Sequence, residues 1–149
     1  MMTQVSEIRI SYKNKISLKN APKISSAECA AKVIFDTWDK DSLELYEEFK
    51  VILLNNSHNV KGILTISKGG ITGTLVDIRI LFAAVLKSLS TAIIITHNHP
   101  SGNKNPSEAD KKLTMKIKNG AELFDIKVLD HIIITPNDEY YSFSNEGLL

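Results

Sequence analysis

The chain has 149 residues, of which 43% are apolar and 23% are charged. These values are typical of one soluble globular domain, which folds without a disulfide or a structural metal, so any metal is expected to serve chemistry. The single cysteine, Cys29, excludes an intramolecular disulfide. The N-terminus lacks a signal-peptide pattern and no apolar run reaches the roughly 18 residues of a membrane span, so we expect a cytoplasmic protein.

Charge is uneven along the chain although the formal net charge is only +1. Residues 1–24 carry five basic residues and one acidic residue, whereas residues 25–60 carry seven acidic residues and three lysines. A basic segment of this kind could contact a nucleic-acid backbone. Lysines that guard the edge of a strand explain it as well, and we favour that interpretation.

Apolar periodicity and turn residues predict nine elements. In chain order these are a short strand over 7–12, a helix over 25–38 that starts at serines, two strands of a hairpin over 49–68, a helix over 76–90, a buried strand over 91–97, a helix from 107 that ends near Gly120, a strand over 125–136 and a short strand over 140–144. Helices and strands mixed in this order predict an α/β (α+β) domain with one mixed sheet flanked by helices.

The loop after the strand over 91–97 holds the strongest chemical signal. His97 and His99 are separated by one residue, so in an extended segment their imidazoles point to the same side, with Asn98 facing away. Asp110 falls on the first turn of the next helix, which can return its carboxylate to the histidines. Two imidazoles and one carboxylate leave one position open for water, which is the pattern of a catalytic zinc site. Zinc lowers the pKa of bound water from about 16 to about 7.

A purely structural interpretation exists for part of this pattern. Ser107 followed by Asp110 also fits the capping box that starts a helix, in which neither residue has another function. That alternative accounts for Ser107 and Asp110, but it does not account for the paired histidines.

The sequence "HNHPSGNKNPSEAD", residues 97–110, resembles the motif of JAMM (MPN-type) metalloenzymes. Its H-N-H-P-S-G and P-S-x-x-D parts resemble the RadC branch, as does the C-terminal "VLDHIIITPNDEYYSFSNEGLL". The likeness covers roughly residues 25–149, which we interpret as a catalytic domain after an N-terminal strand or arm over 1–24. It implies an MPN/JAMM-like (cytidine-deaminase-like) fold.

The resemblance also implies roles for individual residues. His97, His99 and Asp110 would bind Zn²⁺, and Ser107 would hydrogen-bond the oxyanion of a tetrahedral intermediate. A glutamate directly before a buried strand would be the general base.

In this chain the buried strand that should follow the base begins at residue 49, so two glutamates are candidates. Glu48 fits best because it adjoins the apolar run, with Glu47 as the alternative. His131, in an "LDHIII" strand, is either an ordinary core histidine or a support for the metal ligands.

The implied activity is zinc-dependent hydrolysis of a peptide or isopeptide substrate of unknown identity. One alternative is a RadC-like, DNA-repair-associated nucleic-acid-binding protein or metal-dependent nuclease, and another is a scaffold without catalysis. Members of the RadC branch usually carry an N-terminal helix-hairpin-helix-like region, which residues 1–24 are too short to hold, so we expect a stand-alone catalytic domain. No feature predicts the oligomeric state.

Overall fold

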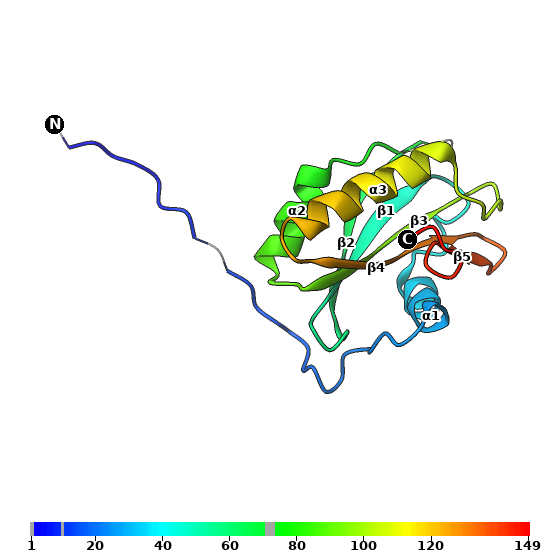
Figure 1. Cartoon of the computed structure of the whole chain (residues 1–149), viewed down its shortest axis with the longest axis horizontal. Helices are drawn as coiled ribbons and strands as arrows, with labels where there is room; N and C mark the ends of the chain where they lie inside the picture. The colour runs from blue at the N-terminus through cyan, green and yellow to red at the C-terminus, as the bar shows by residue number, and fades with distance from the viewer. Residues whose placement is uncertain (1, 10, 71–73) are drawn as a thin grey trace.

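A computed structural model describes residues 2–9, 11–70 and 74–149. The described elements are three helices and five strands, arranged as one sheet between helices (Figure 1). In chain order they are α1 (Ala27–Thr37), β1 (Glu48–Leu54), β2 (Val60–Lys68), α2 (Ile78–Lys87), β3 (Ala92–Asn98), α3 (Glu108–Glu122), β4 (Lys127–Ile134) and β5 (Tyr140–Ser142).

The sheet has the order β2-β1-β3-β4-β5 and is mixed, as the sequence predicts. β1 runs antiparallel to both β2 and β3, β3 pairs parallel with β4, and β4 pairs antiparallel with β5. The parallel pair is joined by α3, which is the usual crossover between parallel strands. The central strand β3 is buried along its whole length, which explains its continuous apolar run.

Helix α1 covers one face of the sheet, and α2 and α3 cover the other (Figure 1). Alternate residues of each strand therefore enter different cores. In β1, Ile52 and Leu54 pack in the core under α1, whereas Phe49, Val51 and Leu53 pack under α2 and α3. This alternation fixes which side chains near the end of each strand share a face.

Side-chain caps begin all three helices. The hydroxyls of Ser26 and Ser107 and the carboxylate of Asp77 each accept a hydrogen bond from a backbone N–H of the first turn, which confirms the predicted helix starts. The predicted end near Gly120 is confirmed to within two residues, because α3 ends at Glu122, although Gly120 itself lies inside the helix. Gly120 instead permits close packing, since an added Cβ would lie 3.0 Å from the Phe82 ring.

The predicted strand over 7–12 is wrong for the residues of that segment that the structure describes. They are exposed and pair with no strand, and Figure 1 shows the segment extending away from the sheet. The ring of Tyr12 lies 4.5 Å from the Lys61 ammonium. The described residues of 1–24 form no named strand, so the lysines of this region protect no strand edge of their own. Ile10, inside this segment, and residues 71–73 of the predicted glycine loop lie outside the described residues.

None of the helices in the described part of the chain combines the length and the apolarity that crossing a bilayer requires.

Candidate metal centre

Strand β3 places both histidines of the H-x-H pair. His97 is buried near the strand end, opposite Phe49 of β1. Its ring stacks on Phe49 with centroids 5.9 Å apart. His99 follows the strand on the same side, and its Nε2 lies 3.0 Å from the Nε2 of His97. The predicted convergence of the two imidazoles is confirmed.

The capping box at the start of α3 brings Asp110 to the histidines. The Ser107 hydroxyl accepts a hydrogen bond from the Asp110 N–H at 3.1 Å, and the Ser107 N–H donates to Asp110 Oδ2 at 2.8 Å. This fixes the Asp110 side chain so that Oδ1 lies 3.3 Å from His97 Nε2 and Oδ2 lies 3.3 Å from His99 Nε2. The capping interpretation is confirmed, and it is compatible with the ligand interpretation because the same cap orients the carboxylate toward the histidines.

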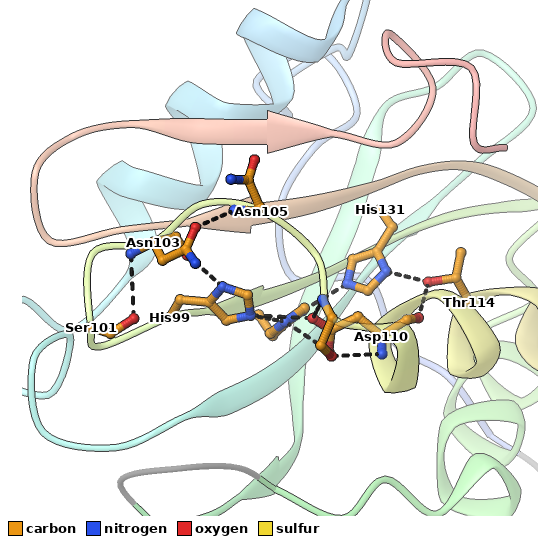
Figure 2. Close-up of polar contacts among 9 residues, drawn as sticks. His99, Ser101, Asn103, Asn105, Asp110, Thr114 and His131 are labelled. Atoms are coloured by element: carbon orange, nitrogen blue, oxygen red, sulfur yellow. Dashed lines mark hydrogen bonds and ion pairs between the residues drawn. The ribbon is translucent and has the colours of Figure 1, made fainter.

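The three groups fit a cation. His99 Nδ1 lies 2.6 Å from the Asn103 carbonyl (Figure 2), which can only accept, so Nδ1 carries the proton and Nε2 of the neutral ring carries a lone pair. The candidate ligand atoms of His97, His99 and Asp110 all lie within 4.8 Å of one another. Nitrogen and oxygen ligands held about 2.0–2.1 Å from one tetrahedral ion are themselves about 3.3 Å apart, close to the observed separations.

Charge coupling within the cluster is strong. Burial raises the pKa of Asp110, but hydrogen bonds from His97 and His99 outweigh it and hold that pKa far below its usual range. Burial lowers the pKa of His99, yet its hydrogen bonds to Asp110 and Asn103 leave that pKa above the ordinary value. A positive charge is therefore favoured among these groups when no metal is bound.

His131, whose role the sequence left open, lies directly behind His97. Its Nε2 is 2.7 Å from His97 Nδ1, and its Nδ1 is 2.5 Å from the Thr114 hydroxyl of α3. Burial lowers the pKa of His131 well below its ordinary value. The ring also stacks on Phe143, with centroids 4.5 Å apart. His131 is thus both a core residue and a neighbour of a candidate ligand.

The structure does not bring Glu48, the favoured base, to this cluster. Glu48 is buried, and its carboxylate forms ion pairs with Lys68 at 3.1 Å and Lys50 at 3.6 Å. The Lys50 ammonium in turn lies 4.1 Å from the Trp38 ring, which belongs to the core under α1. Because side chains alternate along a strand, Glu48 faces α1, on the side of the sheet opposite His97.

Glu47, the alternative, lines a cavity of about 560 Å³ together with His99 and Ser107. Its backbone still pairs with residues 69 and 70, so it shares the face of Phe49 and His97. Burial raises the pKa of Glu47, and the nearby Asp110 also raises it, against the lowering effect of the two histidines. A carboxylate with a raised pKa beside candidate metal ligands is suited to proton transfer.

The cavity beside the metal cluster is shaped by the loop that carries the prolines. Pro100 and Pro106 line it, as does a second acidic residue, Glu44. Ser107 is exposed at its edge. The Ser107 oxygen accepts the helix-capping hydrogen bond, which leaves its O–H proton free to donate.

Asn98 holds the segment that carries Glu47, a role that sequence reasoning missed. Its side chain is fully buried on the α1 face, accepts from the Glu48 N–H at 2.8 Å and donates to the carbonyls of Leu43 and Tyr46 at 2.9 and 3.0 Å. Its position between the histidines predicts only that it faces away from them. Its partners lie 50 to 55 residues earlier, so no local pattern identifies them.

The chain belongs to the family described as the RadC-like JAB domain, whose model matches residues 24–148. It is 52% identical over 103 residues to a UPF0758 protein of Flavobacterium johnsoniae, which covers 69% of this chain and 44% of that protein. A UPF0758 protein of Porphyromonas gingivalis is 41% identical over 103 residues, 69% of this chain and 45% of the relative. A UPF0758 protein of Clostridium beijerinckii is 34% identical over 133 residues, which are 89% of this chain and 56% of that relative.

The aligned regions thus span about half the length of these curated relatives. The class of protein is a JAB domain with a candidate metal site of two histidines and one aspartate.

Proposed function

We propose that the protein is a metal-dependent hydrolase and that Zn²⁺ is held by His97, His99 and Asp110. One observation carries the proposal: three ligand atoms converge within 4.8 Å, and the cavity beside them contains a carboxylate. Two imidazole nitrogens and one carboxylate oxygen form a ligand set typical of catalytic zinc, which keeps an open position.

Glu47 is the general base in this proposal. A bound zinc ion supplies Lewis acidity and lowers the pKa of water. Glu47 accepts the proton of the attacking water and delivers it to the leaving amine, and its raised pKa favours that second transfer. The free O–H of Ser107 donates to the oxygen on which negative charge develops.

The proposed substrate is the amide bond of a peptide or an isopeptide, of unknown sequence. Two features support this class. The family resemblance implies amide hydrolysis, and the cavity carries Glu44 and Glu47, whose negative charges disfavour a phosphate ester at the same place. The activity and partners of the longer relatives are not assumed for this chain.

The test combines metal analysis with an activity screen. The purified chain should contain about one zinc ion, and a peptide and isopeptide library should show cleavage that chelation removes and added zinc restores. The Glu47→Gln variant should retain zinc and lose cleavage. A chain that binds no divalent metal, or that cleaves equally well after chelation, would contradict the proposal.

A second candidate is nucleic-acid binding by residues 1–24. The five basic residues of this segment lie on described, exposed backbone with one acidic residue among them. Such contacts would release counterions, so binding to DNA should weaken steeply between two salt concentrations. Binding that is insensitive to salt, or no binding at low salt, would exclude this candidate, and neither result bears on hydrolysis.

A further inference from the structure

We infer that Thr114 and His131 are positioning residues that determine which ring nitrogen of His97 is available to a metal. The inference rests on the proposed metal site and extends it to two residues that do not contact the ion. It follows from the direction of three consecutive hydrogen bonds between α3, β4 and β3.

Thr114 sets the direction of these three hydrogen bonds. Thr114 Oγ1 lies 2.7 Å from the backbone carbonyl of Asp110, one helical turn earlier (Figure 2). A carbonyl oxygen only accepts, so the threonine hydroxyl must donate its single proton there. The Thr114 oxygen is then left as an acceptor for His131 Nδ1, which lies 2.5 Å away.

The remaining two steps follow from this assignment. His131 donates its Nδ1 proton to Thr114, so Nε2 of the neutral ring carries a lone pair. That nitrogen lies 2.7 Å from His97 Nδ1 and accepts the proton of His97. In the neutral ring the Nε2 of His97 is therefore left unprotonated and available to a metal; this atom lies 3.3 Å from Asp110 Oδ1, to which it donates only when the ring is protonated.

Burial makes these hydrogen bonds the determinant of whether His97 Nδ1 carries a proton. His131 is 0% exposed, Thr114 1% and His97 2%, so bulk water cannot replace a lost partner. Phe49 and Phe143 pack on the two imidazoles, so the polar atoms beside the His97 ring are His131 at Nδ1 and the candidate ligands His99 and Asp110 at Nε2. In an exposed histidine the two neutral tautomers interchange through water, whereas here the backbone carbonyl of Asp110 selects one.

A different acceptor places the proton of neutral His99 on Nδ1. Its Nδ1 donates directly to the Asn103 carbonyl. In their neutral forms both histidines thus present Nε2 lone pairs toward Asp110. The Asn103 carbonyl fixes this state in His99. The Asp110 backbone carbonyl fixes it in His97 through the side chains of Thr114 and His131. Hydrogen-bonded partners of metal-binding histidines usually change metal affinity by about 10–100-fold when they are lost.

The test compares Thr114→Val with Thr114→Ser. Valine keeps the shape but removes the hydroxyl, so His131 loses its acceptor and can donate to His97 instead, which places the His97 proton on Nε2. We expect Thr114→Val to weaken zinc binding by about 10–100-fold in competition with a chromogenic chelator. Thr114→Ser keeps the hydroxyl and should bind zinc nearly as tightly as the wild type.

A second readout does not use zinc. Nitrogen-15 NMR of the metal-free wild type, in mildly alkaline buffer, should show the His97 proton on Nδ1, and Thr114→Val should shift it toward Nε2. A wild-type proton on Nε2, or equal zinc affinity in folded Thr114→Val and Thr114→Ser proteins, would overturn the inference. The wild-type spectrum decides even if Thr114→Val does not fold. A wild type that binds no zinc would refute the proposed function separately.

Discussion

Glu47 and Glu48 are neighbours in the chain, but their carboxylates lie on opposite faces of the sheet. Glu47 lines the cavity that His99 and Ser107 share, whereas Glu48 pairs with Lys68 and Lys50 on the face of α1. The antiparallel pairing of β1 with β3 sets this difference. It places Phe49 opposite His97, and Glu47, two residues before Phe49, shares that face.

Substitution of the two glutamates should therefore have opposite consequences. We expect Glu47→Gln to reduce hydrolysis by about 10²–10⁴-fold, because the base that transfers protons is lost. Its zinc content and unfolding midpoint should change little. Steady-state hydrolysis of a peptide identified in the screen, with metal analysis of the same sample, measures both effects.

The matched control is Glu48→Gln. It should keep nearly full activity and lose on the order of 2 kcal/mol of stability, because it leaves the largely buried Lys50 without its ion-pair partner. Activity loss in Glu48→Gln with full activity in Glu47→Gln would reverse the assignment of the base.

The activity of the zinc-bound wild type should fall on the acid side. Glu47 must be ionised to accept a proton; burial raises its pKa in the metal-free protein, and a bound zinc ion would act in the opposite direction. The rate should therefore decrease as pH falls through the pKa of Glu47. A pH profile of kcat/KM, with buffers of constant ionic strength, measures the acid limb, and an identical limb in the residual activity of Glu47→Gln would contradict the role.

Removal of one ligand should abolish metal binding without unfolding the domain. We expect His99→Ala to lower the zinc content from about one ion per chain to close to none, since two ligands hold zinc poorly. His99 is only half-buried, so the circular dichroism spectrum should remain that of the wild type.

Removal of a histidine outside the cluster provides the comparison for His99→Ala. His58 lies in a turn with φ of 62°, a conformation that asparagine tolerates, so His58→Asn should keep its zinc. Equal zinc in both variants would show that the ion binds elsewhere.

Asn98→Ala should reduce activity while leaving the zinc ligands in place. The substitution removes three hydrogen bonds that hold residues 43–48, so Glu47 should lose its position and the rate should fall by up to about 100-fold. Stability should fall by about 3 kcal/mol, because buried backbone groups lose their partners. Asn98→Asp keeps the acceptor but places a buried carboxylate against the two carbonyl oxygens, so it should be at least as destabilised as Asn98→Ala in denaturant unfolding. Wild-type kinetics in Asn98→Ala would refute this role.

The pH dependence of stability in the metal-free protein should combine opposing contributions from its histidines. The lowered pKa of Asp110 contributes stability above its ordinary value of 3.8, which is lost as pH falls through the folded-state pKa. The raised pKa of His99 contributes stability below its ordinary value of 6.5, which is lost as pH rises through the folded-state pKa. The lowered pKa of buried His131 acts in the opposite sense, because its contribution is present above 6.5 and is lost as pH falls.

Unfolding midpoints in chelator at about pH 5 and about pH 8 measure the sum of these contributions. His99→Gln cannot be protonated at that position, so its midpoint at pH 5, relative to pH 8, should be lower than that of the wild type. Added zinc should raise the midpoint more at pH 8, because the histidines must be neutral to bind it. The same pH dependence in His99→Gln and in the wild type would contradict the contribution of His99.

The sequence predicts most of the elements because their signals are local. Serine and aspartate caps predict the starts of the helices, and the apolar run of β3 predicts a strand buried on both faces. Where a local signal lacks its tertiary context the prediction is wrong. Residues 7–12 alternate like a strand, but their described part has no partner to pair with. Gly120 marks the helix end only to within two residues, because it lies inside α3 and packs against Phe82.

The sequence by itself determined the three candidate metal ligands, because the spacing of His97 and His99 on a strand end and of Asp110 on the first turn of the next helix is a local property of the chain. The tertiary structure alone decided which glutamate lies beside these residues and which side chains are hydrogen-bonded to the Nδ1 side of His97. Those answers depend on the pairing of β1, β3 and β4 and on the packing of α3, which bring together residues far apart in the chain. Moving a strand by one residue exchanges its two faces, and only long-range contacts fix that choice.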